Sequence, residues 1–276
     1  MNYIGIDLGG TNIKGALVSA KGEILKEHSI PTRVDLGPEA VAGRIGQVIA
    51  QLSIGEDTVG GVGVGCPGTV DDASGIVRFA ANLNFVNFDL RSALRAHTAL
   101  PVHLGNDANA AALGEALFGC GRGAESTIVV TLGTGVGAGV VIGGKLYCGR
   151  DTGAGEIGSI PYLDRDYEYY CSSRFFVGRG TTGKEAYERA AAGDPEALAL
   201  WREFGRHVGQ LVMLVLYTYD PEAIVFGGSI AHAFGFFREA MYEQLKRFPY
   251  AKTVEGLHIC CSNIDHVGLL GASACE

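Results

Sequence analysis

The stretch Ile4–Val18, IGIDLGGTNIKGALV, has the same order of parts as a later stretch, Ile128–Ile142, IVVTLGTGVGAGVVI. Each begins with an apolar, β-branched run, turns after a shared Leu-Gly, and resumes as a second apolar run, which predicts two strand–loop–strand hairpins. Glycines at such turns can adopt positive φ and leave no Cβ between backbone N–H groups and a ligand, and threonines add hydroxyl donors. Only four of the fifteen aligned positions are identical, so the repeated pattern is the stronger signal. It predicts two loops that hold a polyphosphate from both sides, the alternative being two ordinary β-hairpins.

The composition is that of a folded protein with a substantial core. The chain has 276 residues, of which 47% are hydrophobic and 19% charged, enough for two α/β domains. Its net charge of -8 argues against a nucleic-acid-binding surface, which is normally basic. We find neither a signal peptide nor a membrane-spanning run, and we expect a cytoplasmic protein with no membrane partner. The seven cysteines include no CxxC pair, so they predict no metal site.

Apolar periodicity predicts alternating strands and helices along the chain. A buried strand at residues 59–65 ends in Gly65-Cys66-Pro67-Gly68, a candidate wall of the substrate site or a plain turn. Residues 69–101 are expected to be irregular, and residues 149–183 show no clear period. A long helix is expected to run to about Tyr219, with Asp194 as its N-cap and Pro195 in its first turn.

Asn106 and Asp107 lie where a short strand is expected to lead into a helix. An aspartate at a helix start is most often an N-cap. Asn106 is a second polar group where one cap would suffice, and this favours another role for Asp107. A general base for a sugar hydroxyl needs such a carboxylate on a rigid element.

Five motifs of this sequence resemble those of the ROK sugar kinases in order and spacing, and the resemblance covers essentially the whole chain. It implies a two-domain, actin-like (ribonuclease-H-like) α/β fold with duplicated phosphate-binding hairpins, and ATP in the cleft between the domains. It also implies phosphorylation of a hexose, usually at the primary hydroxyl. The motifs are Asp7-Leu8-Gly9-Gly10-Thr11, Gly65-Cys66-Pro67-Gly68, Asn106-Asp107-Ala108-Asn109, Leu132-Gly133-Thr134-Gly135-Val136-Gly137 and Gly153-Ala154-Gly155-Glu156-Ile157-Gly158.

The resemblance assigns roles to individual residues of this chain. Asp107 would be the base, and Asp7 would lie near the Mg²⁺ that arrives with ATP. Phosphoryl transfer needs mainly positioning and charge stabilisation, which donor-rich loops, Mg²⁺ and one carboxylate provide. The ATP and phosphate ligands would be Asp7, Gly9, Gly10, Thr11, Asn12, Lys14, Gly133, Thr134, Gly135, Gly227 and Gly228. The sugar ligands would be Gly68, Asn82, Asn106, Asp107, Glu156, Ser159 and Ser173.

One segment departs from the family pattern. Most ROK kinases have a His where this chain has Ser159, followed by a Cys-rich segment that holds Zn²⁺ and supplies a sugar-binding Glu. Here only Cys171 remains of those cysteines, and Ser173 stands at the Glu position. A structural zinc site requires four ligands, and one cysteine cannot provide them, so we expect no zinc. The crowded aromatic side chains are expected to pack as a core instead, or else to offer a stacking face to a sugar ring; they are Tyr167, Tyr169, Tyr170, Phe175 and Phe176.

These observations predict an ATP- and Mg²⁺-dependent kinase of a hexose or N-acetylhexosamine, resembling glucokinase or N-acetylmannosamine kinase. The alternatives are a kinase for a β-glucoside or other modified sugar, and a catalytically silent sugar-binding protein. The resemblance implies that repressors of the same family carry a DNA-binding segment before the first phosphate loop. Only six residues precede Asp7 here, so we do not expect a repressor. We expect an N-terminal domain of residues 1–110, completed by residues 266–276, a larger domain of residues 111–265, and a homodimer.

Overall fold

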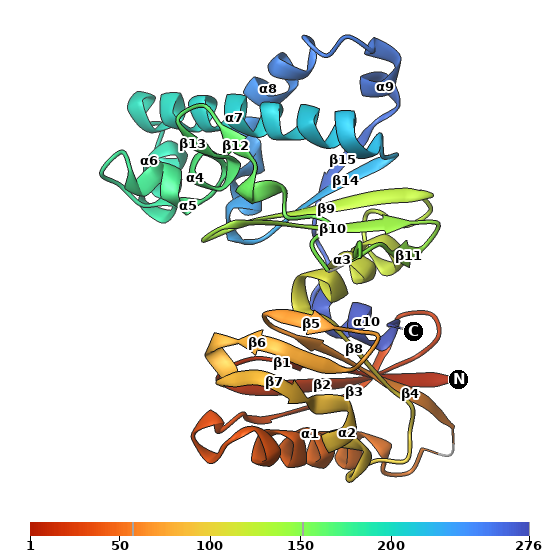
Figure 1. Ribbon diagram of the computed structural model, residues 1–276. Coiled ribbons are helices and arrows are strands. Elements are labelled where there is room, and N and C mark those ends of the chain that lie inside the picture. The colour runs from red at the N-terminus through yellow and green to blue at the C-terminus, as the bar shows by residue number, and fades with distance from the viewer. Residues whose placement is uncertain (57, 151, 276) are drawn as a thin grey trace. The chain divides into compact units, whose positions relative to one another are not determined.

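The computed structural model describes residues 1–56, 58–150 and 152–275, so Glu276, at the end of the expected 266–276 segment, lies outside them. The chain forms two compact units, each of them mixed α/β (Figure 1). Unit 1 comprises Met1–Arg122, Gly144–Ala154 and Ile264–Glu276, and unit 2 comprises Gly123–Gly143 and Gly155–Asn263. No helix in the described ranges is both long and apolar enough to cross a membrane.

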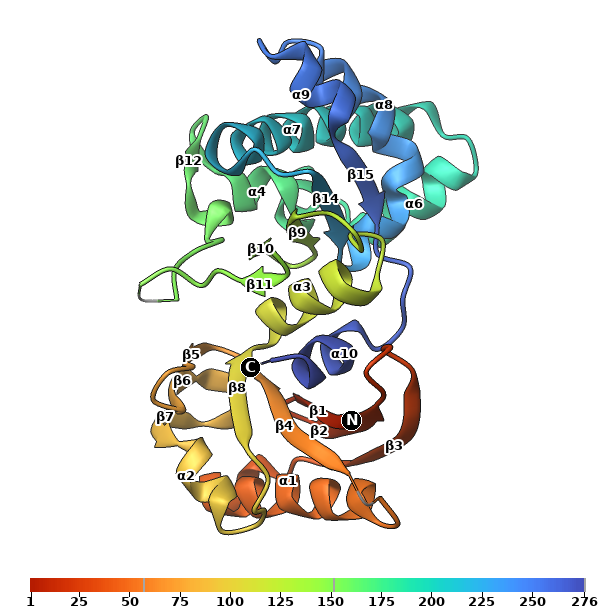
Figure 2. The ribbon, with the colours of Figure 1, turned by 90° about the vertical axis from the view of Figure 1, so that its right-hand side faces the viewer.

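The main sheet of unit 1 carries helices on both of its faces. Figure 2 shows two helices, α1 (Pro38–Ser53) and α2 (Leu90–Arg95), on one face, and α10 (Val267–Ser273) on the other. Next to α10 lies α3 (Asp107–Phe118). In spatial order the strands are β3 (Ile24–Pro31), β2 (Asn12–Val18), β1 (Asn2–Leu8), β4 (Val59–Cys66) and β8 (Val102–Asn106).

A second, antiparallel sheet of unit 1 corrects the expectation that residues 69–101 are irregular. It consists of β5 (Thr69–Asp71), β6 (Ile76–Ala80) and β7 (Phe85–Asp89). These strands are only three to five residues long and pair with one another, so none has the extended apolar run that marks a strand in the sequence. The remaining short elements of this unit are η1 (Val34–Leu36), η2 (Ala81–Leu83) and β11 (Lys145–Leu146).

Unit 2 is built around a sheet. Its strands lie in the order β10 (Val136–Ile142), β9 (Ser126–Leu132), β14 (Ala223–Gly227) and β15 (His258–Cys261). Its longest helix, α7 (Pro195–Tyr219), begins after Asp194, whose side chain accepts hydrogen bonds from two backbone N–H groups, as predicted. The other elements are η3 (Ile157–Ser159), β12 (Pro161–Tyr162), β13 (Arg165–Asp166), α4 (Tyr167–Cys171), α5 (Ser173–Val177), α6 (Gly183–Ala191), η4 (Ser229–Ala233), α8 (Phe234–Leu245) and α9 (Ala251–Gly256).

Both predicted hairpins are present. In unit 1, β1 pairs antiparallel with β2 from Tyr3↔Val18 to Leu8↔Ile13. In unit 2, β9 pairs antiparallel with β10 from Ser126↔Ile142 to Leu132↔Val136. Each loop therefore lies between two strands of a sheet, and most apolar side chains of these strands are buried.

Helix α10 lies unusually close to the backbone of its neighbours in unit 1. A Cβ atom at Gly271 would lie 1.6 Å from the carbonyl oxygen of Ala110 in α3. A Cβ at Gly5 of β1 would lie 2.0 Å from the Leu269 oxygen, and one at Gly63 of β4 would lie 1.7 Å from the Ala272 oxygen. Glycine is therefore required at one side of each of these contacts: in α10 at Gly271, and in the strands at Gly5 and Gly63.

We predict that Gly271→Ala lowers the free energy of unfolding by about 2–3 kcal/mol, because the added methyl group meets backbone that cannot move aside. Gly268→Ala is the matched control, since Gly268 lies in the same helix and a Cβ there would meet nothing within 4 Å. Chemical denaturation of both variants measures the effect. Equal stabilities would contradict the packing argument.

Candidate functional site

Asp107 is the first residue of α3, directly after β8. The N-cap of this helix is Asn106, whose side-chain oxygen accepts hydrogen bonds from the Ala108 N–H at 2.9 Å and the Asn109 N–H at 3.2 Å. The Asn106 amide also donates to the carbonyl oxygen of Gly68 at 2.9 Å. Asn106 therefore has the capping role that was considered for Asp107. The Asp107 carboxylate is exposed, and its Oδ1 accepts a hydrogen bond from the Ala108 N–H.

Asp7 and Lys14 face each other across the first hairpin, as partners in the register of β1 and β2. The parallel register of β1, β4 and β8 places Asp7 opposite Gly65, and Gly65 opposite Gly105. This brings the end of β1 close to Asp107. Burial raises the pKa of Asp7; the Lys14 charge opposes this shift, and the Asp107 charge adds to it.

Thr32 holds the first loop, and sequence reasoning missed it because it belongs to no motif. This fully buried residue donates its hydroxyl to the Gly9 carbonyl oxygen at 2.6 Å and its N–H to the Thr11 carbonyl oxygen at 2.8 Å. A Cβ at Gly10 would lie 2.9 Å from the Asn82 oxygen, so the loop closely approaches a predicted sugar ligand. Thr11, Asn12 and Lys14 are exposed.

The loop glycines do not use the positive φ that glycine permits. The glycines with positive φ do not include Gly9, Gly10, Gly133 or Gly135. Gly10 instead makes room for Asn82, and a Cβ at Gly133 would meet nothing within 4 Å. Positive φ occurs at Gly68, at 88°, where a Cβ would also lie 2.1 Å from the Phe79 oxygen.

Cys66 lies buried at the end of β4, immediately before the turn that contains Gly68. Burial, followed by the Asp107 charge, raises the pKa of the Cys66 thiol to about 12. The thiol is therefore neutral at physiological pH and adds no charge next to Asp107.

In unit 2, backbone and side-chain contacts hold the second loop. Gly133 donates its N–H to the Gly135 oxygen at 3.0 Å and accepts from the Ser173 N–H at 2.8 Å. Val136 N–H donates to Glu168 Oε2 at 3.2 Å. A Cβ at Gly228 would lie 2.4 Å from the Leu132 oxygen, so the predicted adenosine-binding turn approaches the end of β9.

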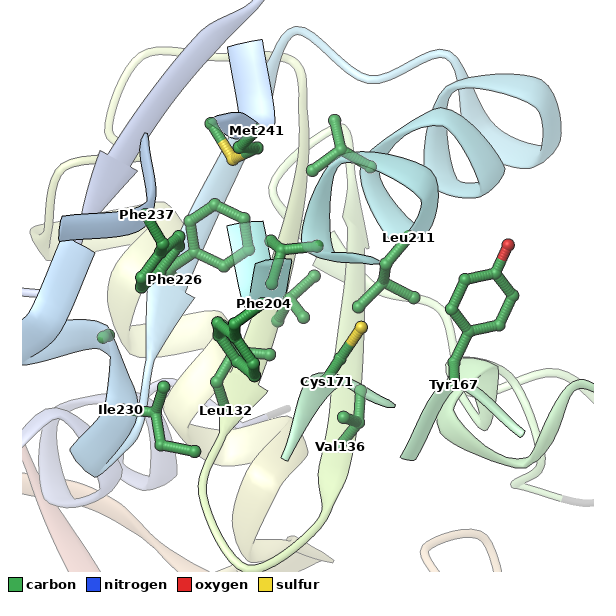
Figure 3. Packing of buried hydrophobic residues seen from close by; sticks show 14 of the residues in the cluster. Leu132, Val136, Tyr167, Cys171, Phe204, Leu211, Phe226, Ile230, Phe237 and Met241 are labelled. Carbon is green, nitrogen blue, oxygen red and sulfur yellow. The ribbon is translucent and has the colours of Figure 1, made fainter. Parts of the chain in front are cut away.

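The altered segment packs largely as an aromatic core, as expected. Tyr167, Cys171, Phe175 and Phe176 all belong to the buried cluster of unit 2, and Figure 3 shows Cys171 among Val136, Phe204 and Leu211. Two further contacts involve Tyr162, which stacks on Tyr167 with ring centroids 4.3 Å apart and has its hydroxyl 3.1 Å from His207 Nδ1. Burial lowers the pKa of His207. In the described parts of the chain, no three His, Cys, Asp or Glu side chains are placed to hold a metal ion.

The structure thus gathers the predicted residues into two groups. One group, in unit 1, contains Asp7, Gly10, Lys14, Gly68, Asn82, Asn106 and Asp107. The other, in unit 2, contains the loop 133–135, Ser173, Gly227 and Gly228. Glu156 is the N-cap of η3 and Ser159 is its last residue, and both are exposed. Besides Thr32, sequence reasoning missed Glu168, which accepts the Val136 N–H, and Arg174, which forms an ion pair with Glu168. No local pattern marks either contact.

Comparisons with known proteins identify the fold and the family. A ROK hexokinase from Thermus thermophilus superposes with a TM-score of 0.86 at 28% identity, covering 99% of this chain and 97% of that one. A ROK glucokinase from Streptomyces griseus, solved with glucose and AMPPNP, gives 0.75 at 30% identity and covers 99% and 98%. The glucokinase of Thermotoga maritima is 33% identical, covering 99% of this chain and 96% of its own length.

The fold is therefore the actin-like fold of sugar kinases. The model of the ROK family matches residues 3–275, and the chain belongs to that family. It is an ATP-dependent sugar kinase, as the motifs implied.

We predict that Asp7→Asn stabilises the folded protein at neutral pH. The raised pKa of Asp7 means that the folded protein holds this proton more tightly than the unfolded chain does, so ionised Asp7 lowers stability as the pH rises through that pKa. We expect a rise in Tm of roughly 1–3 °C at pH 7 that shrinks as the pH falls toward 4. Thermal unfolding at several pH values measures this, and a Tm that falls at pH 7 would contradict it.

Proposed function

We propose that this kinase transfers the γ-phosphoryl group of ATP to the primary hydroxyl of a hexose or N-acetylhexosamine. The observation that carries the proposal is the position of the Asp107 carboxylate. Because Asn106 caps α3, Asp107 is not needed as the cap, and its carboxylate is exposed at the start of a rigid helix. A general base must be held in this way and must reach the hydroxyl proton.

In the proposed reaction, Asp107 accepts the proton of the attacking hydroxyl as its oxygen bonds to the γ-phosphorus. The bond between that phosphorus and the bridging oxygen breaks, and ADP leaves with the electron pair. Little else is required of the protein, because phosphoryl transfer depends mainly on positioning and on stabilising charge. We assign that part to the loops at residues 9–12 and 133–135, with Gly227 and Gly228 against the adenosine.

The charges in unit 1 suit the Mg²⁺ that accompanies ATP. The Asp107 charge adds to the rise in the pKa of Asp7, so two carboxylates already repel each other in this unit. A divalent cation neutralises such carboxylates and the phosphate oxygens. We assign Asp7 to the cation and the exposed Lys14 to phosphate.

Unit 1 and unit 2 each contribute residues that we assign to the sugar. Asn106 is fixed by its hydrogen bond to Gly68, and Asn82 lies against Gly10. The small, uncharged Ser159 and Ser173 replace a His and a Glu of the usual pattern. This relief of bulk and charge supports the second candidate, a kinase for a β-glucoside or other modified sugar.

A panel of hexoses, N-acetylhexosamines and β-glucosides with ATP tests the proposal through ADP formation and product analysis. We predict that Asp107→Asn binds ATP and sugar but lowers kcat by about 10²-fold or more, the scale for loss of a general base. Asp35→Asn, which removes a charge from an exposed pair with Arg33, is the control and keeps kcat. No turnover with any sugar would favour the silent sugar-binding alternative, and normal turnover by Asp107→Asn would exclude Asp107 as the base.

We predict that the purified protein contains no stoichiometric zinc, because buried aromatic side chains order the segment that zinc holds in most relatives. Each such side chain buries roughly 150–250 Å². Dialysis against EDTA followed by Mg²⁺ restoration should leave activity unchanged. Elemental analysis that finds about one zinc per chain would defeat this prediction.

A further inference from the structure

His207 of α7 lies among aromatic rings from three short elements of the segment at residues 159–176. Its Nδ1 is 3.1 Å from the hydroxyl oxygen of Tyr162 in β12, and the two rings meet edge to face with centroids 5.7 Å apart. The His207 ring also contacts Tyr170 of α4, at a centroid distance of 4.6 Å, and Phe175 of α5, at 5.7 Å. One side chain of the long helix therefore contacts β12, α4 and α5 at the same time.

Tyr162 links these contacts to the predicted sugar ligands Glu156 and Ser159. It lies three residues after Ser159, the last residue of η3, and Glu156 is the N-cap of that helix. The backbone between them is itself held, because the Ile160 oxygen accepts the Tyr167 N–H at 3.1 Å. The Tyr162 ring also stacks on Tyr167. A shift of Tyr162 would therefore move the backbone that carries both predicted ligands.

The hydrogen bond between Tyr162 and His207 has a defined direction at neutral pH. Burial is the main cause that raises the pKa of Tyr162 to about 12, so its hydroxyl keeps the proton. Burial also lowers the pKa of His207. The Glu203 charge opposes this shift, and the charges of Arg179 and Arg206 add to it. The Tyr162 hydroxyl therefore donates, and the neutral imidazole of His207 accepts at Nδ1.

Protonation of His207 would disturb this arrangement. Glu203 Oε1 is 3.9 Å from His207 Nε2, but Arg179 forms an ion pair with the same carboxylate. Protonation would place a second positive charge in this group and turn Nδ1 from an acceptor into a donor. The titratable and charged groups around His207 are Glu203 and Arg206 of α7, Arg179 after α5, Tyr162 of β12, and Tyr170 of α4, whose hydroxyl donates to Asp164.

We propose that His207 is a positioning residue for sugar recognition, because it joins β12, α4 and α5 to α7 and thereby holds Glu156 and Ser159 in place. This inference rests on the proposed function, which assigns sugar ligands to this segment. His207 acts through Tyr162 and the backbone of η3, and not by contact with the sugar.

Steady-state kinetics with the sugar of the panel that reacts fastest tests the proposal. We predict that Tyr162→Phe and His207→Phe each raise the KM for the sugar about fivefold, the scale of one lost hydrogen bond, and leave kcat and the KM for ATP nearly unchanged. The double variant should be no worse than either single variant, because both changes remove the same bond. His207→Asn, whose amide oxygen can accept a hydrogen bond near the position of Nδ1, should recover part of the loss. The matched control is Tyr217→Phe, which removes the hydroxyl of an exposed tyrosine of α7.

The pH dependence of the sugar KM gives a second readout, which a purely structural role would not change. The competent form of His207 is neutral, so the wild-type KM for the sugar should rise as the pH falls below about 6.5 and through the lowered pKa of His207. His207→Phe cannot be protonated at this position and should lose that rise.

An unchanged sugar KM in both Tyr162→Phe and His207→Phe would overturn the inference. Equal losses in the sugar KM, the ATP KM and kcat would also overturn it, because His207 would then only stabilise the fold. Sugar phosphorylation with an unchanged sugar KM in the variants would reject the inference alone. If no sugar is phosphorylated, calorimetric titration with glucose separates the two. Weaker glucose binding by both variants would then reject the proposed function and support the inference, and equal or absent binding would reject both.

Discussion

Backbone contacts of α10 position the helix that carries Asp107. This helix comes from the end of the chain and lies on β1 and β4, where Gly5 and Gly63 leave room for its carbonyl oxygens. It also lies against α3, where Gly114 and Gly271 permit similar contacts. None of these positions tolerates a Cβ. The close packing therefore restricts the orientation of α3 relative to β8. The geometry around Asp107 therefore depends on residues at opposite ends of the chain.

In unit 1, the half-buried carboxylate of Asp7 interacts with two other charged groups, Lys14 and Asp107. The raised pKa of Asp7 shows that burial disfavours its charged form and that the facing Lys14 does not fully offset this effect. Groups shifted by burial together with a specific charged neighbour are typical of functional sites. Asn106 and Thr32, by contrast, have their hydrogen bonds satisfied within the protein and hold backbone in place. One set of residues supplies charge, and the other supplies rigidity.

In unit 2, buried aromatic side chains order the segment at residues 159–176. Buried aromatic rings anchor α4 and α5, and the same short helices bring Ser173 and Glu168 to the loop at residues 133–135. A core of aromatic rings needs no metal ligands. It stabilises the folded protein because it removes apolar surface from water. Ser173 and Arg174 lie between the buried residues Ser172 and Phe175.

The sequence by itself determined the two hairpins, the capped start of α7 and the family, because periodicity, capping residues and motifs are local. It identified Asp107 as a candidate base and predicted the aromatic core of the altered segment. Only the tertiary structure showed that β5, β6 and β7 form a sheet, since such short strands are defined by pairing. Only the structure also showed that Asn106 caps α3, that Thr32 holds the first loop and that Glu168 lies against Gly135. The cap of α3 is local, but the contacts of Thr32 and Glu168 join residues far apart in the chain. They arise when several elements pack at once, which no local pattern encodes.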